Sequence, residues 1–225
     1  MKKTFLIALF AAIALSAMAQ EKNYTISGDF TEYEKNFHIP VKVDSVRILN
    51  DSTKATYEVK DGKFQISGRV ERPLYSLLRI YMTDLEEDEE DGEIDVFSRD
   101  IPFILEPGNI VLIYREFLGT PLNNASIEIR NKIFDLTLTE DYDKAKQEAT
   151  AFVKQHAEDP ASIFLIIDLS HHTPMEVRDI LPLIDLCSQD MQHTNTGFTV
   201  ERNRLVKLAN SPQAGDMFKD FSVEY

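Results

Sequence analysis

The acidic run over residues 84–95 is the stretch whose side chains most clearly suggest metal chemistry. Nine of its twelve residues are carboxylates. When Gly92 is placed at the sixth position of an EF-hand loop, Glu87 falls first and Ser98 falls twelfth. The leading aspartate and the bidentate glutamate of such a loop are therefore both absent. We interpret the run as a solvated loop whose like charges repel one another, with calcium binding as the alternative.

Cys187 is the single cysteine of the chain, so no intramolecular disulfide can hold the fold. A cysteine acts as a nucleophile, or resolves a disulfide, only where its thiolate is accessible. Cys187 continues an apolar helical stripe that begins at Val177, and a free cysteine in such a place behaves as a small hydrophobic residue. We expect a buried structural cysteine, with a reactive thiol as the alternative.

His171 and His172 are the remaining candidates for a metal site. Adjacent residues at a helix end do not face one point, and no carboxylate or third histidine stands nearby at ligand spacing. Histidines at a helix C-terminus also interact favourably with the helix dipole. The sequence contains no glycine-rich phosphate loop, nucleophile elbow or metalloprotease helix motif. We therefore predict no catalytic, cofactor-binding or metal-ligating residue, and no cofactor.

The first 19 residues have the pattern of a cleavable signal peptide. Lys2 and Lys3 give a positive start, residues 5–15 form an apolar run too short to cross a bilayer, and residues 17–19 (Ala-Met-Ala) form a cleavage site. We predict cleavage after Ala19 and a periplasmic or secreted protein. The alternative, an uncleaved membrane anchor, lacks a following stop-transfer pattern.

The formal net charge is −14 at pH 7, and it becomes −16 when the two lysines leave with the signal peptide (−14 − 2). An acidic exported protein is repelled by nucleic acid and by anionic lipid. We therefore expect neither as a partner, and no membrane insertion after cleavage. The remaining 206 residues (225 − 19) suffice for one large or two small domains stabilised by apolar burial.

Residues 20–118 are predicted to form an antiparallel β-sandwich or small barrel. Within residues 56–73, apolar positions alternate on both sides of Asp61-Gly62, a pair that suits the type I′ turn of a hairpin. A second hairpin is predicted over residues 103–114, where Pro107-Gly108 fits the centre of a type II turn. Further strands are expected at residues 24–30 and 75–82. Residues 41–48 are expected to form either one strand or two strands that are separated at Asp44-Ser45.

Residues 119–210 lose this alternation and carry helix signals, so the fold class is predicted to be α+β with a C-terminal helical subdomain. Helices are expected over residues 142–156, 161–169 and 200–209. Asp159 is predicted to cap the second of these, with Pro160 at its first position.

A further helix is predicted after Thr173 and Glu176, which have the spacing of a capping box. Its apolar stripe runs through Cys187 to Met191, and Pro182 should kink or split it.

Several short motifs resemble the β-rich N-terminal module of exported bacterial thiol–disulfide oxidoreductases of the thioredoxin/AhpC-TSA family. These motifs are YTISGDF at residues 24–30, DGKFQISG at 61–68 followed by Pro73, FILEPGNI at 103–110 and GTPLNN at 119–124. Pro160 and Ser162 are similar to the Pro-x-Ser helix start of that family. The tail at residues 211–225 contains GDMFKDFS, which resembles the opening of the thioredoxin-like domain that follows the module.

The resemblance places redox chemistry in a Cys-x-x-Cys pair, which has no counterpart in this sequence. Cys187 lies upstream of where that domain would begin, so no residue here inherits the redox role. We therefore expect an exported, non-enzymatic accessory or interaction module whose partner is an envelope protein, with a redox protein as one candidate. Two alternatives stay open, a truncated N-terminal part of a periplasmic oxidoreductase and a β-sandwich that binds peptide or glycan.

Overall fold

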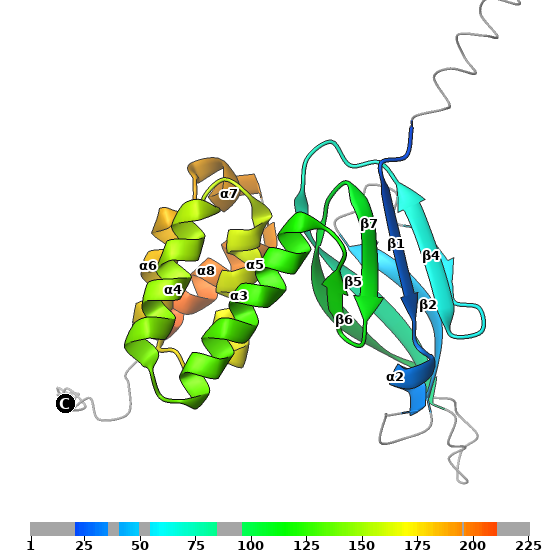
Figure 1. The fold of residues 1–225 in the computed structure, drawn as a ribbon, viewed down its shortest axis with the longest axis horizontal. Coiled ribbons are helices and arrows are strands. Elements are labelled where there is room, and N and C mark those ends of the chain that lie inside the picture. Colours follow the sequence, from blue (N-terminus) through cyan, green and yellow to red (C-terminus); the bar gives the residue numbers. More distant parts are fainter. Residues whose placement is uncertain (1–20, 36–40, 50–54, 85–95, 195, 211–225) are drawn as a thin grey trace, which may run out of the picture. The chain divides into compact units, whose positions relative to one another are not determined.

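The chain has an α+β fold and divides into two compact units between Ile127 and Glu128 (Figure 1). The computed structural model describes residues 21–35, 41–49, 55–84, 96–194 and 196–210. The predicted signal peptide (residues 1–19), residues 85–95 of the acidic run and the tail at 211–225 lie outside the described residues.

Two four-stranded sheets form the first unit. Their strand orders are β4-β1-β7-β8 and β3-β2-β5-β6. Every described pair is antiparallel except β1 with β7, which is parallel. The sheets do not close into a barrel, so of the two predicted forms the sandwich is confirmed. The first sheet comprises β1 Tyr24–Asp29, β4 Lys63–Gly68, β7 Gly108–Ile113 and β8 Glu116–Leu118, and the second comprises β2 Val41–Leu49, β3 Thr56–Glu58, β5 Leu74–Asp84 and β6 Val96–Leu105.

The two sheets share one apolar core. On β5, Leu78 and Ile80 are fully buried, whereas Leu77 and Arg79, which alternate with them, are half-buried and project from the opposite face. Inward residues of both sheets join the same buried cluster, and burying each large side chain contributes roughly 1.5–3 kcal/mol. This alternation leaves the second sheet with an outer face that the core does not use.

The two predicted hairpins are corners that carry the chain from one sheet to the other. The type I′ turn is present, with φ of 50° at Asp61 and 73° at Gly62 and reciprocal 2.9 Å hydrogen bonds between Lys60 and Lys63. The hairpin prediction is wrong, because β3 pairs with β2 whereas β4 pairs with β1. The bend at Pro107 likewise separates β6, which pairs with β5, from β7, which pairs with β1 and β8.

Residues 41–49 form one strand that contains a β-bulge. The register with β5 shifts between Val43 and Ser45, so Asp44 is the extra residue. The bulge lets Val43 and Val46, three positions apart, both point into the core. The interrupted period at Asp44-Ser45 therefore marks a bulge and not a break.

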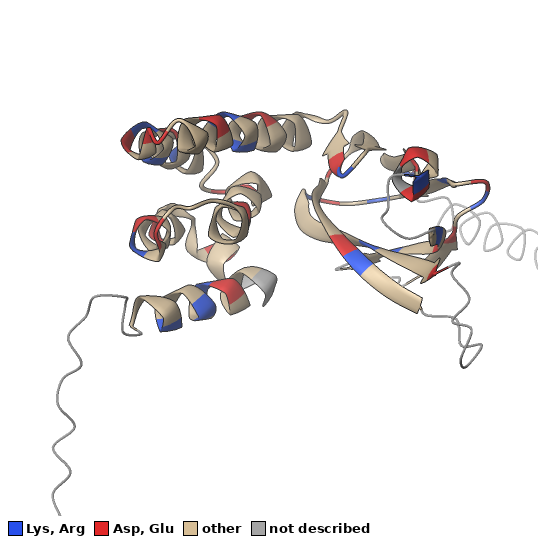
Figure 2. Ribbon diagram, turned by 90° about the horizontal axis from the view of Figure 1, so that it is seen from below, with Lys and Arg blue, Asp and Glu red and all other residues tan. Residues whose placement is uncertain are grey.

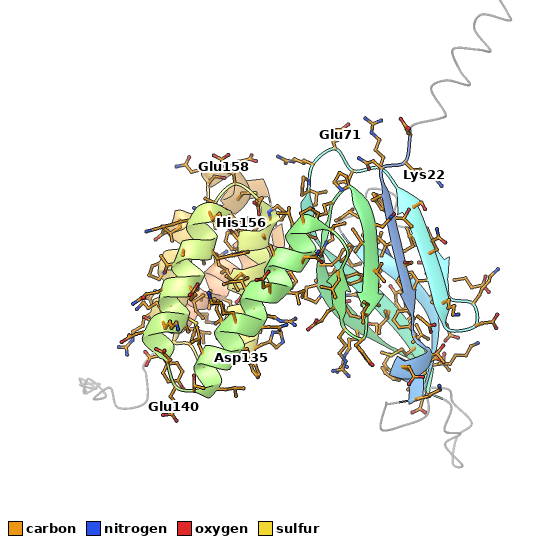
Figure 3. The ribbon with its side chains drawn as sticks, viewed as in Figure 1. Lys22, Glu71, Asp135, Glu140, His156 and Glu158 are labelled. Atoms are coloured by element: carbon orange, nitrogen blue, oxygen red, sulfur yellow. The ribbon has the colours of Figure 1, made fainter. Side chains whose placement is uncertain are left out.

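Helices make up the second unit, and Pro160–His172 (α5) is buried on most sides. Asp159 caps α5 as predicted, accepting a 3.0 Å hydrogen bond from the Ala161 backbone N–H. His156 ends α4 (Figure 3). Its Nδ1 lies 2.8 Å from Oδ2 of Asp159. No helix in the described part of the chain is long and apolar enough to cross a membrane. The helices are α2 Thr31–Lys35 and α3 Pro121–Leu138, which begin in the first unit, then α4 Tyr142–Gln155, α5, α6 Val177–Leu186, α7 Gln189–Thr194 and α8 Thr196–Ala209.

The capping box predicted at Thr173 is wrong. Thr173 ends α5 and its hydroxyl donates to the Leu169 carbonyl, while α6 starts after Glu176 without a side-chain cap bond. Pro182 lies inside the continuous helix α6. The interruption comes instead at Cys187, which caps the C-terminus of α6 and places Met191 on α7.

Candidate functional site

Cys187 is 4% exposed, which confirms the prediction that this side chain is buried. Its thiol donates a weak hydrogen bond to the Leu183 carbonyl, with an S···O distance of 3.8 Å. Burial in apolar surroundings raises the pKa of the Cys187 thiol to about 11. Because the thiolate is the nucleophilic form, this side chain has little capacity for thiol chemistry at neutral pH.

His171 and His172 each face a separate carboxylate. His171 Nε2 lies 3.2 Å from Oε2 of Glu201 on α8, and His172 Nδ1 lies 3.1 Å from Oδ1 of Asp168 one turn earlier on α5. The expectation that no carboxylate stands nearby at ligand spacing is wrong, because Asp168 lies four residues, one helical turn, before His172. Sequence reasoning missed Glu201 because it is thirty positions away along the chain. No group of three or more His, Cys, Asp or Glu side chains suited to a metal occurs among the residues that the structure describes.

Glu201 is 7% exposed and joins α8 to the end of α5. Its carboxylate accepts hydrogen bonds from Arg204 Nη2 at 2.6 Å and from Ser170 Oγ at 2.5 Å. Burial acts to raise the pKa of Glu201, but the hydrogen bonds from Arg204 and Ser170 outweigh it and lower that pKa. The Ser170 hydroxyl bonds the carboxylate and not an imidazole, so this arrangement fastens two helices and provides no activated serine.

Two of the motifs behind the family resemblance meet in a buried group that we call the clasp, formed by Glu106, Thr120 and Asn123. Glu106 Oε1 accepts hydrogen bonds from the backbone N–H of Leu122 at 2.9 Å and of Asn123 at 3.0 Å, at the start of α3. The Asn123 amide binds both backbone groups of Ile104, accepting from its N–H at 2.9 Å and donating to its carbonyl at 2.7 Å. A carboxylate at a helix N-terminus is favourable, and the clasp ties α3 to β6.

The outer face of the second sheet carries a group that we call the arginine row, formed by Arg47, Arg79 and Asp100. Arg47 on β2 is directly opposite Arg79 on β5, which is directly opposite Asp100 on β6. Directly opposed residues of antiparallel strands project from the same face, with Cβ atoms roughly 4.5–5.5 Å apart. Acidic and basic residues are interspersed along strands and helices in both units (Figure 2).

Within the arginine row, Arg79 and Asp100 form a bidentate pair. Nε and Nη2 of Arg79 each lie 2.8 Å from an oxygen of Asp100. These hydrogen bonds, with the attraction of the charges, raise the pKa of the Arg79 guanidinium above its usual value. Arg47 is half-buried, and its Nε is buried without a hydrogen-bond acceptor within the described residues. The row therefore sets a guanidinium with an unpartnered donor beside one that is already paired.

An apolar row adjoins the arginine row on the same face. Leu49, Leu77 and Pro102 are mutually opposed across the three strands and are half-buried. Rows on one face of a strand are two residues apart, which is roughly 6.6 Å. No sequence motif indicated either row, because their members come together only through the strand register.

Comparisons of the chain with protein-family models, with curated proteins and with solved structures found no match.

Proposed function

We propose that this chain is an exported, non-enzymatic accessory module related to the N-terminal region of thioredoxin-family thiol–disulfide oxidoreductases. It acts by docking a protein partner at the cell envelope, and a redox protein with a thioredoxin-like domain is the partner that the resemblance favours. The clasp carries this proposal. Glu106 from FILEPGNI and Asn123 from GTPLNN lie in contact although they are distant in sequence. Motifs that converge on one buried structural contact support a common domain, and they give no reason to expect catalysis from it.

The state of the single thiol supports the same proposal. Cys187 is buried and its pKa is raised to about 11, whereas thiol–disulfide exchange requires an accessible thiolate. His171 on α5 contacts Glu201 on α8, and His172 contacts Asp168 within α5. The side chains of the second unit that could take part in catalysis therefore have structural partners.

Direct binding tests the proposal. The mature chain, residues 20–225, is titrated by calorimetry against purified exported thioredoxin-like domains of the source organism, each oxidised and reduced. We expect a dissociation constant below about 100 μM for at least one of them. We also expect the chain alone not to accelerate insulin reduction by dithiothreitol. Insulin reduction by the chain alone, or no binding to any of these domains, would overturn the proposal.

The tail motif at residues 215–222 favours one second candidate, the N-terminal part of a longer oxidoreductase. The two proposals differ in what the gene encodes beyond Tyr225. An in-frame Cys-x-x-Cys after this codon favours the longer enzyme, whereas a stop codon favours the separate module.

A further inference from the structure

We draw no further inference here: the strongest candidate, the hollow beside α4, has only one wall among the described residues, a single stripe of that helix that includes Lys146, Thr150 and Lys154, and nothing in that part of the chain shows what would occupy it.

Discussion

Gly28 lies directly beneath the ring of Phe64 on the neighbouring strand. A Cβ atom on Gly28 would come 2.4 Å from Cε1 of that ring and 3.0 Å from Cβ of Leu112. The same packing occurs with the strands exchanged, because Gly68 on β4 lies opposite Tyr24 on β1. A Cβ atom on Gly68 would come 2.3 Å from Oη of Tyr24. The motifs YTISGDF and DGKFQISG therefore lie on paired strands, β1 and β4. The glycine that follows Ile-Ser in each motif makes room for an aromatic ring of the other strand.

This packing predicts that Gly28→Ala lowers the free energy of unfolding by about 1–3 kcal/mol, because the added methyl group must displace Phe64 or Leu112. Ser27→Ala, on the opposite face of β1, is the matched control and should change stability by less than about 0.5 kcal/mol. Urea unfolding followed by circular dichroism measures both. Equal stability of Gly28→Ala and wild type would contradict the packing argument.

The clasp predicts a larger loss for Asn123→Ala. The substitution leaves the buried N–H and carbonyl of Ile104 without their side-chain partner, so we expect a loss of about 2–4 kcal/mol. Asn124→Ala removes one hydrogen bond from the exposed Gly119 N–H and should cost about 1 kcal/mol or less. The same urea experiment compares them. If the two variants lost equal stability, the clasp would not be the stronger contact.

Sequence reasoning located the turns and missed where the strands go. Asp61-Gly62 adopts the predicted left-handed conformation because positive φ is a local property of those two residues. The choice of partner strand is not local. Val59 donates to the carbonyl of Asp44, which keeps β3 on the second sheet, and only an isolated bridge between Lys60 and Lys63 remains of the expected hairpin.

Helix α3 was missed although its start carries a recognisable signal. Pro121 occupies the first helical position. The helix buries Asn123, Ser126 and Thr137, and these polar residues obscure the apolar stripe from which a helix is recognised. The arginine row could not be predicted, since Arg47 and Arg79 become neighbours only through the pairing of β2 with β5.

Ionisation of Glu201 should contribute to the pH dependence of the free energy of unfolding. Its pKa is lowered from 4.5 in the folded state, so its stabilising contribution is present above pH 4.5 and is lost as the pH falls through the lowered value. Glu201→Gln should therefore reduce stability at pH 7 by about 1–3 kcal/mol, because Arg204 and Ser170 lose a charged acceptor. Urea unfolding at intervals from pH 3 to 7 should show the difference from wild type shrinking below pH 4.5. A difference that does not change with pH would exclude an ionised Glu201 as the source of the contact.

Asp168 should affect the pH dependence of stability in the direction opposite to Glu201. Burial raises its pKa from 3.8, and the nearby charges of Arg130 and His172 only partly oppose this effect. Its charged form is therefore a cost to the folded state that is absent below pH 3.8 and grows as the pH rises through the raised value. Asp168→Asn should be as stable as wild type or more stable at pH 7, with the difference vanishing toward pH 3. A strong loss of stability at pH 7 would mean that the contact with His172 outweighs the cost of burying the carboxylate.

Cys187 should be nearly inert in the folded protein. With its pKa raised from 9.0 to about 11, the thiolate fraction at pH 7.4 falls roughly 100-fold, and burial restricts access further. Labelling with a chromogenic disulfide reagent should therefore be at least about 100-fold slower in the native state than in urea. The Glu201→Gln variant supplies the control, because it destabilises the unit that contains Cys187, and labelling through unfolding of that unit should accelerate by the factor that corresponds to its lost stability. Native labelling as fast as in urea would mean that Cys187 is an accessible thiolate, and it would reopen the reactive-thiol alternative.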